Sequence, residues 1–329
     1  MQKNKNNKPI LNELKNKNLK IKMQNKGKKF MNEFKSGFVT VIGKTNVGKS
    51  SLINKLTGEK VSAVTSKSQT TRKNVKAIVN RPNSQIIFID TPGFHKPLSK
   101  LSNIMNEEAI GSIPDVDIIL YMVDAKEKEI DEKAIEKIKE SGKATILLIN
   151  KIDLIKKEDL VKLIEKYSKI YDFKAIIPIS VKSNKNLEAV FEEIENNLEP
   201  GEKYYDDDEY TDQTMREIVE EIIREKALKL LRDEVPHGIY VEVTKMKMGK
   251  TLKNEKIYNI NATVYCLRNS HKGIIVGKGG SMLKKIGTYS REDIEKMLGT
   301  KVNLQLYVKV NEDWINNDKY LKQFKSKEN

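Results

Sequence analysis

Cysteine and long apolar runs are nearly absent from this sequence of 329 residues. The single cysteine, Cys266, excludes an internal disulfide and a cysteine-rich metal site, and it fits a reducing compartment. No run approaches the ~18 consecutive apolar residues of a membrane-spanning helix, and the longest, Ile118 to Val123, lies between two aspartates. The beginning of the chain also lacks the apolar stretch of a signal peptide. We therefore expect a soluble, cytoplasmic protein.

Positive charge is concentrated at the two ends of the chain, whose formal net charge is +15. Residues 1–35 contain 11 Lys or Arg and 2 Asp or Glu, and residues 213–329 contain 23 and 15. Residues 36–212, in contrast, contain 27 and 29. Because basic surfaces attract nucleic acids, the composition predicts a nucleic-acid partner for the C-terminal third of the chain.

The length allows about two domains, and the sequence pattern predicts four segments. Residues 1–35, rich in Lys and Asn, predict a disordered basic tail. Met31 leaves open whether this tail belongs to the native protein or arises from an upstream start site. We expect residues 36–200 to form one domain. Residues 213–329 are expected to form a second domain that ends in a C-terminal tail. The acidic residues 201–212 predict a linker between them.

Apolar strands alternate with helical patterns through the first domain. We expect strands at 38–42, 74–80, 85–90, 117–123, 144–149 and 175–179. We expect helices near 49–57, 98–109, 129–140, 157–170 and 186–198. This alternation is typical of an α/β fold with a doubly wound, mostly parallel sheet. Such a sheet binds its ligand at the carboxyl ends of its strands.

A phosphate-binding loop follows the first of these strands. The pattern G-x-x-x-x-G-K-[ST] is matched by Gly43, Lys44, Thr45, Asn46, Val47, Gly48, Lys49 and Ser50. The preceding strand and the following helix supply the context that this motif needs. Its glycines let the backbone curl, so that N–H groups point at phosphates. Lys49 is expected to reach the β- and γ-phosphates, and Ser50 to ligate Mg²⁺.

Two further segments are expected beside the phosphates. The strand at 85–90 leads into a D-x-x-G motif, formed by Asp90, Thr91, Pro92 and Gly93. Asp90 can hold Mg²⁺ through water, and the Gly93 N–H can reach a γ-phosphate. The polar loop before the second strand contains Thr71, which we expect to close onto Mg²⁺ when the γ-phosphate is present. Thr70 is the alternative.

The base is predicted to be guanine. The strand at 144–149 is followed by an N-K-x-D motif, Asn150, Lys151, Ile152 and Asp153. A buried Asp153 carboxylate would accept hydrogen bonds from guanine N1–H and N2, whereas adenine would leave it underpaired. Ser180 and Val181 follow the next strand, where the backbone N–H of Val181 would meet guanine O6. In this order the motifs match a P-loop GTPase domain, although Val181 replaces the usual Ala.

Hydrolysis is expected to be slow, because Phe94 stands where Ras-like GTPases place a water-orienting glutamine. His95 is adjacent, but a lone surface histidine is more often inert. The pattern resembles the branch of GTPases with an apolar residue at this position. Several of its members use a K⁺ ion held by the phosphate-loop asparagine, which here is Asn46. The expected catalytic residues are Lys49, Asn46, Thr71 and Gly93.

The sequence pattern of the second domain predicts an α+β fold of the type II KH class. An apolar helix near 215–231 is followed by strands at 239–243 and 260–266, two helices and a final strand at 302–310. Cys266 is then a small core residue. The G-x-x-G of a KH domain lies between the two later helices, where it lets a nucleic-acid backbone approach closely. The predicted RNA contacts are Lys272, Ile274, Ile275, Val276, Gly277, Lys278, Gly279 and Gly280.

The two signatures in this order resemble the Era family of ribosome-assembly GTPases over about residues 34–315. The likeness includes the segments 69–72, 224–228, 234–237, 271–280 and 309–314. Departures are Val181, the tail before Met31, and Thr45 where the family usually has proline. The resemblance implies an Mg²⁺-dependent GTPase that binds the 3′ end of 16S rRNA and helps to mature the small ribosomal subunit. It also implies that GTP hydrolysis changes the RNA affinity of the protein or releases it. Loose association with the inner membrane face is known in the family; we expect a monomer.

Three rival interpretations differ in what they require. A constitutive KH RNA-binding protein, whose nucleotide site is regulatory or inactive, would need no Asp153. A metabolic ATPase or kinase would contain neither the N-K-x-D motif nor a KH domain. A relative with two tandem GTPase domains is excluded by the single phosphate loop.

Overall fold

A six-stranded sheet in the order β2-β3-β1-β4-β5-β6 forms the centre of the first domain. The structure, a computed structural model, describes residues 33–65, 71–92, 99–111, 113–127 and 129–324, so most of the predicted tail lies outside it. β2 is antiparallel to β3, and the other neighbouring strands are parallel. The strands are β1 (Lys35–Ile42), β2 (Val75–Arg81), β3 (Ser84–Asp90), β4 (Ile118–Asp124), β5 (Ala144–Asn150) and β6 (Ala175–Pro178).

Helices cover both faces of this sheet. They are α2 (Lys49–Thr57), α3 (Lys100–Gly111), α4 (Glu132–Ser141), α5 (Lys157–Ser168) and α6 (Leu187–Asn197). Apolar side chains of α2 and α6 pack with one face, and those of α4 and α5 pack with the other. Along β1, Val39 and Val41 lie in the first cluster and Ile42 in the second, as expected for a strand buried on both sides. The predicted doubly wound fold is confirmed.

The order of the strands places a switch point of the sheet at β1. β1 lies between β3 and β4. The chain passes from β1 through α2 to β2 on one side of β1, and from β3 through α3 to β4 on the other. In open α/β sheets such a switch point is where ligands bind, outside the carboxyl ends of the strands. The phosphate loop follows β1, Asp90 ends β3 and Asn150 ends β5. The predicted nucleotide motifs therefore lie at one edge of the sheet.

The second domain packs three helices on one face of a three-stranded sheet in the order β7-β8-β9. β7 and β8 are antiparallel, and β8 and β9 are parallel. The elements are α7 (Met215–Leu230), β7 (Tyr240–Lys250), β8 (Lys256–Cys266), α8 (Asn269–Val276), α9 (Ser281–Leu298) and β9 (Lys301–Val310). This confirms the predicted α+β KH fold, and Cys266 lies in its core. A short helix α10 (Asp318–Leu321) follows.

Short 3-10 turns complete the described elements: η1 (Ile152–Leu154), η2 (Val235–Gly238), η3 (Lys278–Gly280) and η4 (Lys322–Phe324). None of the described helices is long and apolar enough to cross a membrane.

The acidic segment between the domains lies along β2 and β3. The side chain of Gln85 accepts hydrogen bonds from the N–H groups of Tyr204 and Tyr205, at 2.7 and 3.0 Å. The Ile78 N–H donates to the carbonyl of Tyr210 at 3.0 Å. The segment therefore covers the antiparallel edge strand of the first sheet, a position that protects unpaired backbone groups.

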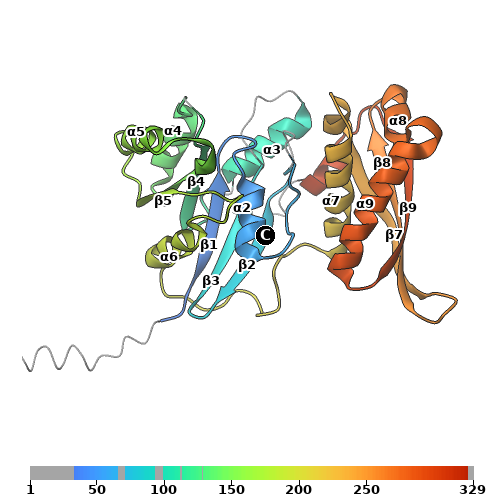
Figure 1. Ribbon diagram of the computed structural model, residues 1–329, viewed down its shortest axis with the longest axis horizontal. Helices are drawn as coiled ribbons and strands as arrows, with labels where there is room; N and C mark the ends of the chain where they lie inside the picture. Colours follow the sequence, from blue (N-terminus) through green and yellow to red (C-terminus); the bar gives the residue numbers. More distant parts are fainter. Residues whose placement is uncertain (1–32, 66–70, 93–98, 112, 128, 325–329) are drawn as a thin grey trace, which may run out of the picture.

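The two domains lie side by side, and α7 is on the side of the second domain that faces the first (Figure 1). Between them, α3 packs against the residues after β9. Leu101, Ile104 and Met105 of α3 form one buried cluster with Tyr240, Trp314, Leu321 and Phe324. The domains thus share an apolar contact as well as the polar contacts described below.

Candidate functional site

Two glycines of the phosphate loop are required by what surrounds them. At Gly43 (φ 147°) a Cβ would lie 2.2 Å from the backbone oxygen of Met122 on β4. At Gly48 (φ 114°) it would lie 2.5 Å from Nδ2 of Asn150. Glycine alone permits so close an approach at such dihedral angles. The loop therefore lies directly against the sheet and leads into α2, where backbone N–H groups can meet an anion.

The ammonium group of Lys49 lies inside the loop. Its Nζ donates to the carbonyl oxygens of Gly43 and Lys44, at 2.9 and 3.0 Å. Burial lowers the pKa of Lys49 to about 8, and the nearby Asp90 carboxylate opposes this shift. Phosphate groups would supply the negative charge that stabilises the ammonium form. The position and the depressed pKa both fit the predicted contact with the β- and γ-phosphates.

Three predicted metal ligands lie together beside the loop. Ser50 Oγ is 3.0 Å from Thr71 Oγ1, which donates to Oδ2 of Asp90 at 3.2 Å. Asp90 is fully buried, and burial raises its pKa. Its other oxygen, Oδ1, is buried without a hydrogen-bond partner among the described residues. A hydrated Mg²⁺ fits this group, because it would offer water protons to Asp90 and accept hydroxyl ligands.

The predicted base-binding residues are joined by side-chain hydrogen bonds. Ser180 Oγ donates to Oδ1 of Asp153 at 2.6 Å, and this bond lowers the pKa of Asp153 below its ordinary value. Asn150 donates to the carbonyl of Val47 at 2.8 Å and accepts from the N–H of Val181 at 3.1 Å. If the Val181 N–H also contacted guanine O6, this one donor would be shared between O6 and the Asn150 side chain.

Asp153 differs from the expectation in one respect: it is exposed and not buried. It lies in the short turn η1 after β5, at the surface of the domain. A guanine ring would itself cover the carboxylate. Lys151 has the left-handed conformation (φ 66°), and its Nζ donates to the carbonyl of Asn46 at 2.8 Å. Lys151 also pairs with Asp124 at 2.6 Å, so the base-binding turn is connected to the phosphate loop.

Other predicted residues lie around the phosphate loop, and their positions do not test their predicted roles. Asn46 is exposed with φ 63°, Lys44 pairs with Glu127, and Thr45 is partly exposed. Thr91 donates to the Val41 carbonyl at 2.9 Å, which fixes the start of the D-x-x-G turn. The remaining predictions lie outside the described residues: Gly93, the alternative Thr70, Phe94 and His95.

The G-x-x-G loop joins α8 to α9 through η3. A Cβ at Gly277 (φ 72°) would lie 2.8 Å from Cβ of Met282, so only glycine fits there. Gly279 and Gly280 also have positive φ, at 58° and 79°, but a Cβ at either would meet open space. Lys278 is exposed beside them. The loop is thus closed against α9 on one side and open to a ligand on the other.

One predicted RNA contact is wrong. Ile275 is fully buried in the core of the second domain, whereas its neighbour Ile274 is 49% exposed. Successive residues of a helix point about 100° apart, so the apolar run before the loop is divided between core and surface. Lys272 is exposed and Val276 is partly exposed.

Comparison with known proteins agrees with both domains. A family model described as a 50S ribosome-binding GTPase matches residues 38–151, and a KH domain model matches residues 234–315. A GTPase Era from Clostridium kluyveri is 48% identical over 292 residues, which are 88% of this chain and 98% of the relative. The chain belongs to the Era family of GTPases. The Era of Clostridioides difficile is 45% identical over 295 residues, with the same coverage.

Two solved Era structures are similar over the same range. One is Era in complex with MgGDPNP and nucleotides 1506–1542 of 16S rRNA, and the other is an Aquifex aeolicus Era variant bound to GDP and AlF4⁻. Each has a TM-score of 0.84 and 39% identity, and each match covers 88% of this chain. They cover 98% and 99% of those chains, so this Era-family protein matches them in both domains.

Arg72, directly after Thr71, connects the predicted nucleotide site to the KH domain. Its guanidinium donates to the carbonyls of Ile239 and His237, at 2.7 and 3.1 Å, and lies over the ring of Trp314 with 5.3 Å to the centroid. Arg72 is buried, and burial lowers its pKa to about 9, so it remains a cation at neutral pH. No motif around Arg72 indicates this role, although Arg72 belongs to a segment of the family resemblance.

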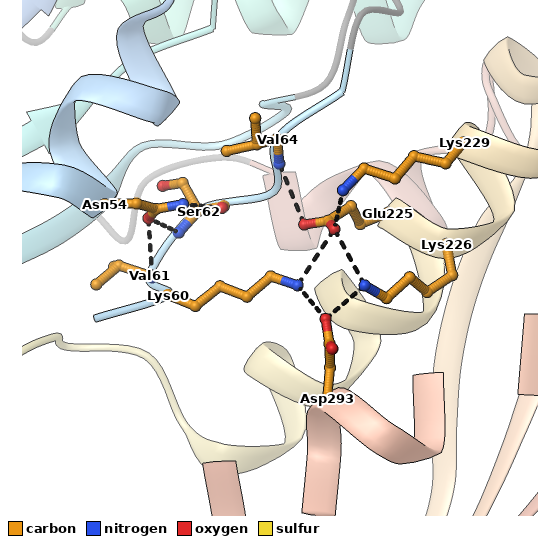
Figure 2. A network of polar contacts seen from close by, with 9 residues as sticks. All are labelled: Asn54, Lys60, Val61, Ser62, Val64, Glu225, Lys226, Lys229 and Asp293. Carbon is orange, nitrogen blue, oxygen red and sulfur yellow. Dashed lines mark hydrogen bonds and ion pairs between the residues drawn. The ribbon is translucent and has the colours of Figure 1, made fainter. Parts of the chain in front are cut away.

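A polar network joins the chain after α2 to helices α7 and α9 (Figure 2). At its centre, the side chain of Glu225 is 1% exposed and accepts from the Val64 N–H at 3.2 Å. Lys60 pairs with Glu225 at 3.2 Å and with Asp293 at 2.7 Å, and Lys229 pairs with Glu225 at 2.6 Å. Residues 60–64 are therefore held against α7 and α9.

Proposed function

We propose that this Era-family GTPase binds the 3′-terminal region of 16S rRNA through its KH loop, and that the bound guanine nucleotide controls this binding. The solved Era with 16S rRNA nucleotides 1506–1542 supports the choice of RNA. Nucleotide control is supported most strongly by two consecutive residues that contact different parts of the protein. Thr71 contacts the proposed metal ligands, and Arg72 contacts the KH domain.

Nucleotide binding is proposed to use the residues at the carboxyl edge of the sheet. Asp153 accepts from the guanine edge, and Lys49 and the loop N–H groups hold the phosphates. Ser50 and Asp90 would hold Mg²⁺, and the bound ion would neutralise charge that develops on the phosphates. Thr71 joins this shell when a γ-phosphate is present. Because Arg72 follows at once in the chain, a movement of Thr71 would displace the contact with His237 and Ile239.

The partner and the location follow from the same proposal. The 3′ end of 16S rRNA belongs to the small ribosomal subunit, so assembling small subunits are the proposed partner. We propose that the protein acts there as a cytoplasmic monomer. The basic residues 1–30 would add weak, salt-sensitive attraction to RNA or to the anionic inner membrane face.

Crosslinking tests the proposed RNA target. The protein bound to a GTP analogue is irradiated with small ribosomal subunits, and the linked peptides and nucleotides are mapped. We expect the peptide that contains Lys278 to be linked to nucleotides near the 3′ end of the small-subunit RNA. Links distributed over the whole subunit RNA, or confined to residues 36–200, would contradict the proposal.

Hydrolysis is expected to depend on K⁺. The exposed Asn46 has a left-handed backbone conformation at the mouth of the loop, where an amide oxygen could help to hold a monovalent cation. Replacing KCl by NaCl at constant ionic strength should lower the hydrolysis rate severalfold, and Asn46→Asp should alter this preference. GTP affinity measured in both salts separates binding from hydrolysis. Identical rates in the two salts would remove K⁺ from the mechanism.

A further inference from the structure

The sheet of the KH domain has one covered face and one partly open face. Alternate residues of β7, β8 and β9 pack against the three helices in the core. On the opposite face, Tyr240 and Tyr265 at one end are covered by the cluster that contains Trp314 and Phe324. Toward the β7–β8 hairpin, the residues of that face are exposed on β7 and β9 and half-buried on β8.

The strand register sorts the residues of this opposite face into rows. Lys245, Asn261 and Gln305 are neighbours across the three strands, and the next row is Lys247, Asn259 and Asn303. A further row toward the covered end contains Glu242, Thr263 and Tyr307. We call the six residues of the first two rows, together with Tyr307, the outer sheet face. It combines amides, lysines and one aromatic ring.

The charge of this face is strongly one-sided. The outer sheet face contains two lysines and no carboxylate, and the one Glu of the three strands lies in the row toward the covered end. That carboxylate, Glu242, accepts from the Tyr265 hydroxyl at 2.9 Å. Among the described residues, neither Lys245 nor Lys247 forms an ion pair, and both are exposed. The face therefore attracts polyanions.

The amides and the tyrosine are arranged to meet bases. Asn303 donates to Asn259 at 3.1 Å, and the Tyr307 hydroxyl donates to Gln305 at 3.1 Å. These bonds orient the amides, and Asn303 and Gln305 remain exposed. The Tyr307 side chain is 49% exposed, so its ring is accessible for stacking. Lysines with an exposed aromatic ring are typical of surfaces that bind single-stranded nucleic acid.

We propose that the outer sheet face is a second binding site for single-stranded RNA, separate from the G-x-x-G loop. The inference rests on the proposed RNA-binding function and adds a site to it. A protein partner would require an apolar centre, and a membrane would require inserted apolar side chains, whereas the two rows consist of lysines and amides. Single-stranded RNA matches this chemistry best, and we expect the same RNA molecule to be bound at the KH loop as well.

The position of β9 makes a continuous path possible. β9 is an edge strand of the sheet, and α8, which leads into the G-x-x-G loop, packs against it. A strand of RNA that leaves the loop can pass around β9 and reach Asn303, Gln305 and Tyr307. The outer sheet face would then contact only RNA longer than the few bases that a KH loop holds.

Two RNAs of different length test the inference. Fluorescent oligonucleotides of about 6 and about 18 nucleotides from the small-subunit 3′ end are titrated with the full chain. We expect Tyr307→Ala and Lys247→Glu each to weaken binding of the longer RNA about tenfold and to leave the shorter RNA unaffected. Added salt should diminish the effect of Lys247→Glu more than that of Tyr307→Ala. Gly279→Asp should weaken binding of both RNAs.

A matched variant and a second probe complete the test. Lys296→Glu makes the same charge change at an exposed position on α9 and should leave both affinities unaltered. Unchanged binding of the longer RNA by folded outer-face variants would overturn the inference, as would equal losses for both RNAs. Loss of binding to anionic phospholipid vesicles, with RNA binding intact, would assign the face to a membrane instead. If the wild-type chain bound neither RNA, the proposed function itself would fail.

Discussion

Asp153→Asn should abolish the preference for GTP and make a xanthosine nucleotide the better ligand. Guanine offers two donors to Asp153, and an amide would place a donor against one of them. The Ser180 hydroxyl donates to Oδ1 at 2.6 Å and should hold the amide oxygen on its own side, so that the amide nitrogen faces the base. Xanthine has a carbonyl where guanine has its amino group and would accept from that nitrogen. We expect GTP affinity to fall by about 100-fold or more.

Calorimetry with GTP and xanthosine triphosphate measures this exchange directly. Asp159→Asn is the matched control, because it makes the same change at an exposed carboxylate on α5. The control should bind GTP like the wild type. Equal GTP affinity of the wild type and Asp153→Asn would show that Asp153 does not select the base.

Gly279→Asp should remove most RNA affinity while GTP hydrolysis in the absence of RNA continues. Gly279 has φ 58°, a conformation that Asp tolerates better than most residues, and a Cβ would meet no atom within 4 Å. The variant is therefore expected to fold. Its carboxylate would project where an RNA backbone approaches most closely, beside Lys278, and both its bulk and its charge would oppose binding. We expect a loss of at least about tenfold for specific RNA.

Two controls separate the causes of this loss. Gly279→Asn adds nearly the same bulk without charge and should lose less affinity, especially at low salt. Deleting residues 1–30 should weaken only salt-sensitive, unspecific binding, because a lysine-rich tail has no base readout. Titrations with specific and scrambled RNA at two salt concentrations distinguish these effects. Discrimination that survives in Gly279→Asp and is lost on deletion of the tail would refute the role of the KH loop.

Short-range features were predictable because their physical cause lies in the nearby sequence. The phosphate loop needs glycines where the structure has Gly43 and Gly48, and each predicted strand of the first sheet is present. Two local details were wrong. Ile275 belongs to the core because helical geometry divides an apolar run between two faces. Asp153 is exposed because the base that would cover it is not part of the chain.

Contacts between the domains could not be predicted from pattern. Arg72 meets Ile239, 167 residues later in the chain, and Lys60 meets Asp293, 233 residues later. No periodicity or motif links positions so far apart. The family resemblance included the segments that contain Arg72 and Glu225, but it did not indicate what these two side chains contact. The structure supplies one, because both side chains are buried where the nucleotide-binding domain meets the KH domain.

The central claim, that nucleotide state reaches the KH domain through Thr71 and Arg72, has a direct test. The measurement is the ratio of RNA affinities in the GTP-analogue and GDP forms, for the wild type, Arg72→Ala and Lys73→Ala. We predict at least about tenfold tighter RNA binding with the GTP analogue in the wild type, within the usual range of allosteric coupling. The ratio should approach one in Arg72→Ala. It should be nearly retained in Lys73→Ala, which removes only a partly exposed ion pair with Glu217. A wild-type ratio of one, or a wild-type ratio retained in Arg72→Ala, would contradict the account.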